Sequence, residues 1–439
     1  MMLQARQGGK CSCAIMCGFV LFTVFSQVQA QDPVDMLVEI NANLYEVAEQ
    51  TDGFLTLKGL RTATMAHLAM HDAINSVAPQ FQTFTATEKS PQADLTAAFV
   101  QAAFAVINTE FPNATQLTQL QQNFLNAIPE SARKSAGIAL GNRIAATIKE
   151  RRQGDGWDSE AEYQFHPMAP GVYAEFKDHS GTPQGFVFGT GWAQARGFAL
   201  SKPDQFRAPP PPAIKSDPYT KAFNEVKSLG RFQSMTRTPD QTHIALWWKD
   251  FAENSHNRLA RDLVTRESLS LHDAARLFAL VNMSIYDAYI SSFENKFHYN
   301  HWRPYTAIRW ASNDENPDTE EEPTWTNTHR HTYAFPSYPS AHGTACAAAA
   351  TAFATVLGNE TSFTMRNPVV DIAGPLSGKI NMQPPVRSFD SFSDAATECG
   401  LSRVYLGIHF RYDSEQGVAL GKQVGNNVVE HWLLPIKKG

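Results

Sequence analysis

Cysteine is scarce in this sequence. Only five of its 439 residues are cysteines, which is too few for a small scaffold held together by disulfides. Three of them, Cys11, Cys13 and Cys17, fall in the first thirty residues, so the rest of the chain holds only Cys346 and Cys399. We expect these two to be buried free thiols, although an oxidising compartment would allow them to pair.

An excess of basic charge is also lacking. The chain has 37 Lys and Arg against 43 Asp and Glu, which gives a formal net charge of −6 at pH 7. Proteins that bind nucleic acid carry a basic patch or stripe instead, so nucleic acid is excluded as an expected partner. The 43% of hydrophobic residues is enough to build a large core.

Long apolar runs are absent except near the start of the chain. Arg6 and Lys10 precede an apolar run over residues 14–25, and residues 28–30 resemble an A-x-A cleavage site. The run is shorter than the roughly 20 apolar residues that span a bilayer. We therefore expect a signal peptide over residues 1–30, no stable membrane anchor, and a secreted or periplasmic protein.

The processing of this segment gives a first prediction. The mature amino terminus should lie within a few residues of Gln31, because the apolar run is too short to remain as an anchor. The intact mass of the exported protein measures this. A membrane-bound form that keeps Met1 would contradict it.

Two stretches of helical pattern match one another in the same order in both halves of the chain. RTATMAHLAMHDA at 61–73 aligns with RLFALVNMSIYDA at 276–288, and GIALGNRI at 137–144 aligns with GVALGKQV at 417–424. Two matched blocks indicate an internal duplication. Asp72 and Asp287 occupy equivalent places on apolar helices, and a buried carboxylate needs a partner, so we expect both to form structural bridges.

Helix signals dominate both halves, and strand signals are few. We predict an all-α fold of two related four-helix bundles, over residues 31–153 and 241–439. Residues 154–240 are rich in Gly, Pro and aromatic residues and are predicted to form a long irregular connector that wraps the bundles. Sites between the helices of a bundle are common, and the second half carries the chemistry described next.

Three blocks in the second half combine cations, helix-start residues and histidines. They are Lys296-x6-Arg303-Pro304, Pro339-Ser340-Ala341-His342 and Ser402-Arg403-x5-His409-x3-Asp413. Arginine offers a planar fork of N–H donors for two oxygens at once, lysine supplies a point charge, and a helix that starts near Ser340 would present free backbone N–H groups. These residue types suit a multiply charged oxyanion.

The ordered blocks resemble the vanadium-dependent haloperoxidases and the acid and lipid phosphatases that share their site, whose pattern is KxxxxxxRP, PSGH and SRxxxxxHxxxD. FPSYPSAH at 335–342 looks like the FPxYPSGH stretch of fungal chloroperoxidases, and SRVYLGIHFRYD at 402–413 looks like their SRxxLGxHxRxD stretch. Trp302 also fits. Ala341 stands where the family has glycine, which keeps the backbone donor provided that no positive φ is needed there.

The resemblance implies a role for each matched residue. The cofactor would be vanadate with pentavalent vanadium, held by Lys296, Arg303, Ser340, Arg403 and the backbone N–H of Ala341. His409 would be the metal ligand and Asp413 would fix its tautomer. His342 would be the acid/base that handles the proton of peroxide.

The resemblance also implies an activity and its partners. Vanadium would act as a Lewis acid on hydrogen peroxide, so that halide is oxidised to hypohalous acid, which then reacts with a small organic acceptor. Phe335, Trp302 and His298 are candidates for the halide pocket, His301 lies close by, and we expect bromide and iodide to be preferred over chloride. A homodimer is common in such families and stays open.

The main alternative is an acid phosphatase that uses the same residues. His409 would then attack phosphorus to give a phosphohistidine, and His342 would protonate the leaving group. The aromatic connector and the match around Phe335 and Trp302 favour the haloperoxidase. A binding protein with a dead site is disfavoured because every ligand and acid/base position is filled.

Overall fold

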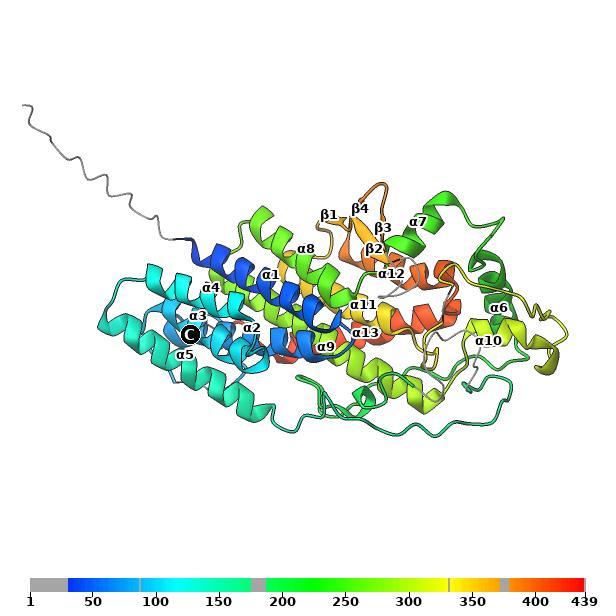
Figure 1. The fold of residues 1–439 in the computed structure, drawn as a ribbon, viewed down its shortest axis with the longest axis horizontal. Helices are drawn as coiled ribbons and strands as arrows, with labels where there is room; N and C mark the ends of the chain where they lie inside the picture. Colours follow the sequence, from blue (N-terminus) through cyan, green and yellow to red (C-terminus); the bar gives the residue numbers. More distant parts are fainter. Residues whose placement is uncertain (1–30, 87, 175–186, 331, 372–378, 438–439) are drawn as a thin grey trace, which may run out of the picture. The chain divides into compact units, whose positions relative to one another are not determined.

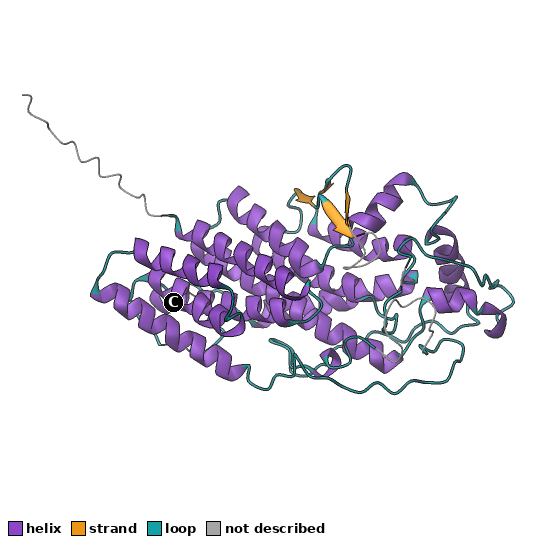
Figure 2. Ribbon diagram, viewed as in Figure 1, coloured by secondary structure: helices purple, strands orange, loops and turns teal. Residues whose placement is uncertain are grey.

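A computed structural model describes residues 31–86, 88–174, 187–330, 332–371 and 379–437. Helices make up most of this part of the chain (Figure 2), which confirms the predicted all-α class. The predicted signal peptide lies outside the described residues. Among the helices that are described, none is both long and apolar enough to cross a membrane.

The first half forms a bundle in which α2, α3 and α5 pack against one another, while α4 packs on α3. Asp32, Asp94 and Ser131 begin helices α1, α3 and α5 because each side chain accepts a backbone N–H of the first turn. The helices of this half are α1 (Pro33–Asp52), α2 (Lys58–Val77), α3 (Leu95–Glu110), α4 (Thr115–Ala127) and α5 (Ala132–Arg151).

The second half is built around α9, a helix of 29 residues that is buried over most of its length. It contacts α2 of the first half on one side and α8, α11 and α13 on others (Figure 1). The helices of this half are α8 (Ala252–Arg266), α9 (Leu271–Tyr299), α10 (Pro304–Arg309), α11 (Ala341–Leu357), α12 (Phe392–Leu406) and α13 (Arg411–His431), with a short 3-10 turn η2 (Ala311–Asn313).

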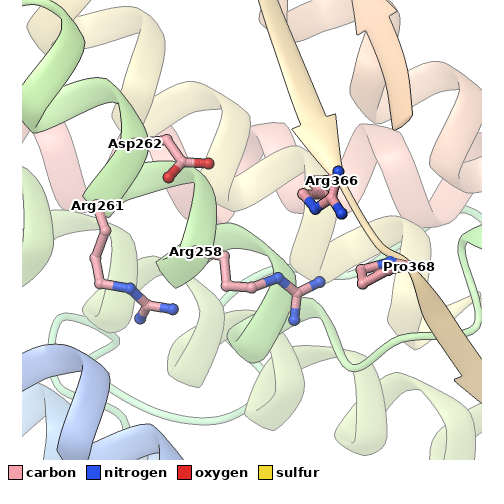
Figure 3. A pocket seen from close by; sticks show the side chains of 5 residues that line it. All are labelled: Arg258, Arg261, Asp262, Arg366 and Pro368. Carbon is pink, nitrogen blue, oxygen red and sulfur yellow. The ribbon is translucent and has the colours of Figure 1, made fainter. Parts of the chain in front are cut away.

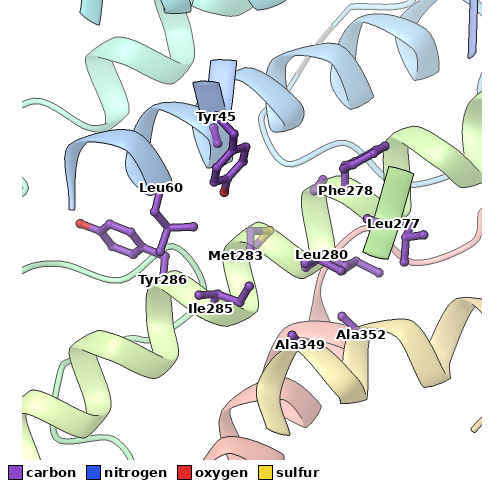
Figure 4. Packing of buried hydrophobic residues seen from close by; sticks show 14 of the residues in the cluster. Tyr45, Leu60, Leu277, Phe278, Leu280, Met283, Ile285, Tyr286, Ala349 and Ala352 are labelled. Carbon is purple, nitrogen blue, oxygen red and sulfur yellow. The ribbon is translucent and has the colours of Figure 1, made fainter. Parts of the chain in front are cut away.

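One hydrophobic cluster joins the two halves. Leu277, Phe278 and Met283 of α9 belong to the same cluster as Leu60 of α2 and Ala349 of α11 (Figure 4). Burying a large apolar side chain contributes about 1.5–3 kcal/mol, so this continuous core fixes α9 in place. The end of α9, where Lys296 lies, is therefore held by packing along the whole helix.

Short strands interrupt the helical pattern between α11 and α12. They form two antiparallel two-stranded sheets of order β1–β4 and β2–β3, with Phe363 opposite Phe389 and Val370 opposite Ile380. The strands are β1 (Phe363–Arg366), β2 (Val369–Asp371), β3 (Lys379–Asn381) and β4 (Val386–Phe389). These short sheets were not predicted from the sequence.

The stretch predicted as a connector is irregular over much of its described length. It also contains the 3-10 turn η1 (Trp192–Gln194) and the helix α6 (Asp217–Leu229), and α7 (Pro239–Trp247) begins at its end. Helix α6 contacts α10, α12 and α13 of the second half. Glu225 of α6 pairs with Arg411 at the start of α13, with 2.5 Å between Arg411 Nη2 and Glu225 Oε1.

The two matched sequence blocks occupy equivalent positions in the fold. A methyl group added at Gly137 of α5 would lie 2.5 Å from the carbonyl oxygen of Asp94, and one added at Gly417 of α13 would lie 2.5 Å from that of Ser340. Asp94 and Ser340 are the N-cap residues of α3 and α11. One turn later, a methyl group added at Gly141 would lie 2.6 Å from the carbonyl oxygen of Ala98, and one added at Gly421 would lie 2.2 Å from that of Thr344. The α3–α5 and α11–α13 pairs thus share one contact pattern.

The equivalent residues Asp72 and Asp287 both accept hydrogen bonds from the backbone of a nearby loop. Asp72 accepts the backbone N–H groups of Phe84 and Thr85, at 2.7 and 2.8 Å. Asp287 accepts those of residues 198, 199 and 200, at 2.6, 2.7 and 2.9 Å. Each buried carboxylate therefore ties a loop to its helix, in line with the structural role that the sequence predicts.

The close approach of α13 to α11 gives a second prediction. Gly417→Ala should destabilise the protein by about 1–3 kcal/mol, because its methyl group overlaps the Ser340 carbonyl and must push the two helices apart. Gly343→Ala is the control, since its methyl group would meet nothing closer than 3.3 Å. Denaturant unfolding measures both changes. Equal stability of the two variants would show that the helices tolerate separation.

Candidate functional site

The three sequence blocks lie at helix ends. The first is at the end of α9, the second at the start of α11, and the third runs from the end of α12 into α13. Asn300 adopts a left-handed conformation (φ 46°) and ends α9 just after Lys296. Pro304 starts α10, which leaves Arg303 as its N-cap in an extended conformation. Gly407 ends α12 with φ 81°, so His409 lies in the short link before α13.

Lys296 is fully buried at the end of α9. Its Nζ donates to the backbone carbonyls of Pro336, Ser337 and Pro339, at 3.1, 2.7 and 2.6 Å. The proline-rich loop 335–340 is therefore folded around this ammonium group. Burial lowers the pKa of Lys296 well below its usual value, and the neighbouring Arg303 lowers it further.

Arg303 occupies the same pocket from the other side of the loop. Its Nε donates to the Phe335 carbonyl at 2.9 Å, and its Nη1 donates to the Ile408 carbonyl at 3.0 Å. The same Nη1 lies 3.3 Å from Nε2 of His409. Burial lowers the pKa of Arg303 to about 10, which still leaves it charged at neutral pH.

Arg403 is the third buried cation. Its Nε donates to the Ser402 hydroxyl at 3.0 Å, and its Nη2 donates to the backbone carbonyl of Trp248 at 2.5 Å. Burial lowers the pKa of Arg403 to about 10. Trp248 could not be predicted from the sequence, because a backbone acceptor leaves no signal in the residue type.

His409 is held by a hydrogen-bonded pair of residues behind it. Its Nδ1 lies 3.0 Å from Oδ2 of Asp413, which also accepts the hydroxyl of Ser337 and, at 3.1 Å, the backbone N–H of Phe410. With Nδ1–H donating to Asp413, the Nε2 atom carries the lone pair. Ser337 was missed in the sequence, although a polar residue inside the proline-rich loop is a usable signal.

Charge is the most informative property of this site. Burial, together with the charges of Arg303 and Lys296, lowers the pKa of His409 well below its usual value, so the imidazole stays neutral. Burial raises the pKa of Asp413, whereas the hydrogen bond from Ser337 and the charge of Lys296 lower it. Two like charges 4 Å apart repel by on the order of 4 kcal/mol at an effective dielectric of ~20, so the three buried basic side chains whose charges act on His409 would be stabilised by an anion.

Ser340 and His342 lie at the start of α11, as predicted. Ser340 is the N-cap: its hydroxyl oxygen accepts the N–H of Gly343, and its own N–H donates to the Asp413 carbonyl at 2.9 Å. Ala341 is an ordinary helical residue, so its alanine keeps the backbone donor without strain. Among the described residues, Nε2 of His342 is buried without a hydrogen-bond partner. Burial and Arg403 lower the pKa of His342 well below its usual value.

The three candidates for a halide pocket occupy different surroundings. The Phe335 ring faces both cations, with its centroid 4.6 Å from Cζ of Arg303 and 5.4 Å from Nζ of Lys296. Trp302 is fully buried in a separate cluster beside Tyr219. His298 is exposed, and the nearby His301 is buried and lies 2.8 Å from the Tyr412 hydroxyl.

The two cysteines after residue 30 are paired, contrary to the prediction of free thiols. Cys346 of α11 and Cys399 of α12 form a disulfide, with their Cα atoms 6.6 Å apart, whereas free thiols were expected. The residues lie 53 positions apart in the sequence, so their proximity depends on how α11 and α12 pack. The bridge is within the usual range of Cα separations for disulfides.

A cavity of about 250 Å³ opens elsewhere, between α8 and β1 (Figure 3). Its lining residues are Arg258, Arg261, Asp262, Arg366 and Pro368, and none of them belongs to the three motifs. Arg258 is paired with Asp250 at 2.6 Å, and Arg261 donates to the Asn41 side-chain oxygen at 2.6 Å. Arg258 in this cavity therefore already has a carboxylate partner, and Arg261 has a neutral one.

Comparison with known proteins gives a consistent result. Residues 276–437 match a family described as the VCPO second helical-bundle domain. The vanadium chloroperoxidase of Curvularia inaequalis is 27% identical over 268 residues, which cover 46% of this chain and 42% of that protein. The matched segment thus spans less than half of this relative.

Solved structures extend the similarity to the fold of nearly the whole chain. A bacterial vanadium-dependent iodoperoxidase superposes with a TM-score of 0.74 at 21% identity, covering 92% of this chain and 98% of the other. The holo form of a bacterial vanadium-dependent chloroperoxidase gives a TM-score of 0.62 at 16% identity, covering 91% and 92%. The predicted resemblance is confirmed.

Proposed function

We propose that this chain, which shares its helical fold and the sequence of its second bundle with vanadium-dependent haloperoxidases, oxidises halide with hydrogen peroxide by means of bound vanadate. The observation that carries the proposal is a neutral histidine on which the charges of three buried basic side chains act, with Arg303 Nη1 3.3 Å from its Nε2. This arrangement offers positive charge to an oxyanion and a nitrogen ligand to its central atom.

The residues present fit vanadate. Lys296, Arg303 and Arg403 would neutralise its negative charge, and the Ser340 hydroxyl and the N–H groups at the start of α11 would donate to its oxygens. Nε2 of His409 would bond vanadium. When bound, vanadate supplies Lewis acidity that activates peroxide toward nucleophiles.

The protein's own groups divide the remaining tasks. Asp413 and Ser337 orient His409 so that its lone pair faces Arg303 and the cation pocket. His342 is held neutral, so its unpartnered Nε2 can accept the proton that peroxide loses and return it later. The buried cations also stabilise developing negative charge on oxygen, because a water-poor site strengthens such interactions.

We further propose that bromide and iodide are oxidised more readily than chloride. Chloride is the hardest of the three to oxidise and needs the most strongly activated peroxide. In this protein the three N–H donors of Lys296 are already engaged by loop carbonyls, which limits what this residue can offer an oxyanion. We also propose that a small organic molecule accepts the oxidised halide. We propose in addition that the protein is secreted or periplasmic and that it forms a homodimer.

A third prediction follows for Phe335. Chlorination by the unmodified protein should be at least about tenfold slower than bromination, a barrier difference of ~1.4 kcal/mol. Phe335→His should lower the ratio further, because a polar ring beside Arg303 and Lys296 competes for their charge. Phe297→His is the control, since that ring packs on Tyr163 and Phe293. Equal chlorination and bromination rates would refute this preference.

The phosphatase alternative rests on the same neutral His409, whose lone pair could attack phosphorus instead of binding vanadium. His342 would then give a proton to the leaving alcohol. The residues are shared, so only the reaction separates the two functions.

One experiment tests the proposed function. Halogenation of monochlorodimedone and hydrolysis of p-nitrophenyl phosphate are measured on the apo-protein with and without orthovanadate. Vanadate should switch on the first reaction and inhibit the second. Phosphate hydrolysis without any vanadate-dependent halogenation would establish the phosphatase instead.

A further inference from the structure

The disulfide lies directly behind the candidate site. Cys346 is one turn after His342 on α11, and Cys399 is one turn before Arg403 on α12. The bridge therefore joins the helix that carries the acid/base to the helix that carries a buried cation. Sγ of Cys399 lies 3.8 Å from the backbone carbonyl of His342, which brings sulfur next to this residue.

The two sulfurs and the imidazole of His342 form one group of potential metal ligands. Their ligand atoms lie within 4.8 Å of one another, and both cysteines are fully buried. A buried imidazole nitrogen normally finds a donor or acceptor, and among the described residues Nε2 of His342 has neither.

We propose that Cys346, Cys399 and His342 form a binding site for a soft divalent cation such as Zn²⁺ when the disulfide is reduced. Two thiolates and one imidazole are a ligand set that zinc uses, with a fourth position left for water. Hard cations such as Mg²⁺ prefer oxygen ligands, which this group does not supply.

Geometry and charge both allow the ion. Zinc holds sulfur at ~2.3 Å and nitrogen at ~2.0–2.1 Å, so the ligand atoms of a tetrahedral site lie roughly 3.5–3.8 Å apart. Once the S–S bond has opened, the sulfurs must separate only to this distance. Two thiolates cancel the charge of Zn²⁺, so the loaded site is neutral and does not repel the nearby Arg403.

The disulfide would gate this site through the redox state of the two sulfurs. A dithiol or phosphine reductant supplies two electrons, the S–S bond breaks, and two protons complete two thiols. Hydrogen peroxide reverses the step: the two thiols form the S–S bond, and their two protons and two electrons convert peroxide to two waters. The cysteines thus respond to the oxidant that the proposed function consumes.

Zinc bound to Nε2 would remove His342 from catalysis, a consequence that rests on the proposed function. A nitrogen ligated to zinc cannot accept a proton from peroxide, so halide oxidation should fall by the ~10²–10⁴ typical of a lost acid/base. Vanadate binding should persist, because His409 is not part of the zinc site.

The test starts from the full chain with Cys11, Cys13 and Cys17 replaced by serine, so that the first thirty residues cannot bind metal through sulfur. This reference protein is reduced with a phosphine under anaerobic conditions and titrated with Co²⁺ and Zn²⁺. One equivalent of Co²⁺ should produce the near-ultraviolet charge-transfer absorption of thiolate ligation, and Zn²⁺ should displace it.

Variants of the reference protein identify the ligands. Cys346→Ser/Cys399→Ser should abolish the charge-transfer absorption and weaken Zn²⁺ binding by at least ~10²-fold. His342→Ala should weaken it by ~10–100-fold while keeping the absorption, and the exposed His431→Ala should change neither.

Several outcomes would overturn the proposal. They are equal Zn²⁺ binding by the oxidised and reduced reference protein, Zn²⁺ binding that survives loss of both cysteines, and an affinity unchanged by His342→Ala. These readouts do not use enzyme activity. If halide oxidation is absent in every state, the proposed function fails, but the zinc titration still decides this proposal.

Discussion

Replacing His409 by alanine should abolish the binding of orthovanadate, whereas His342→Ala should leave the Kd within about tenfold. The difference follows from the surroundings of the two rings. Nδ1 of His409 lies 3.0 Å from Asp413, and with its proton on Nδ1 its Nε2 would offer a lone pair to vanadium. His342 lies in the first turn of α11, where its Nε2 has no hydrogen-bond partner among the described residues, and we propose that it carries protons and does not bind vanadium.

Activity should separate the variants in a second way. His342→Ala should reduce halide oxidation by ~10²–10⁴-fold at saturating vanadate, the range expected for a lost acid/base. His301→Ala is a matched control, because His301 is also buried but lies against the Tyr412 hydroxyl. Isothermal titration measures vanadate binding. If both His409→Ala and His342→Ala lost binding to the same extent, the two roles would be wrongly assigned.

Arg403→Met should weaken vanadate binding by about 2–5 kcal/mol, or roughly 30- to 5,000-fold in Kd. The reason is that truncating one partner of a buried, hydrogen-bonded charge pair costs this much. Arg403 is only 3% exposed, so little solvent screens its interaction with an anion.

Arg411→Met is the matched control for this change. It removes the same charge close to His409, but Arg411 is partly exposed and already paired with Glu225. Surface ion pairs contribute about 0–1 kcal/mol, so vanadate affinity should stay within about fivefold. An equal loss of affinity in the two variants would mean that net charge, and not the buried donor, governs binding.

Much of the candidate site could be predicted because three ordered motifs resemble those of a known family, and this resemblance implied that Lys296, Arg303 and Arg403 converge. The residue types alone suited an oxyanion but did not place the three side chains together. Ser337 and Trp248 could not be placed in the same way. Their contributions depend on how the 335–340 loop and the α7–α8 turn fold against the motifs.

The internal duplication could also be predicted from the sequence, because the glycines that allow close helix packing recur at matching positions in 137–144 and 417–424. The structure adds why only one half carries the site. Ser340 begins α11, whereas the equivalent N-cap of α3 is Asp94, which places a carboxylate at the helix start. That charge already satisfies the positive end of the helix and would repel an oxyanion.

The strands between α11 and α12 and the disulfide were not predictable for a different reason. The residues of β1 and β4 are joined by pairing between segments more than fifteen positions apart, and Cys346 meets Cys399 only after α11 and α12 have packed. Such contacts depend on tertiary structure, and local pattern does not specify them.

The central claim is that three buried cations and His409 hold one vanadate ion, and a crystal structure of the protein with orthovanadate tests it most directly. The account predicts a single vanadium atom bonded to Nε2 of His409, with its oxygens in hydrogen-bond distance of Arg303, Arg403 and the start of α11. Vanadate bound away from His409, or contacted by none of these cations, would contradict the account.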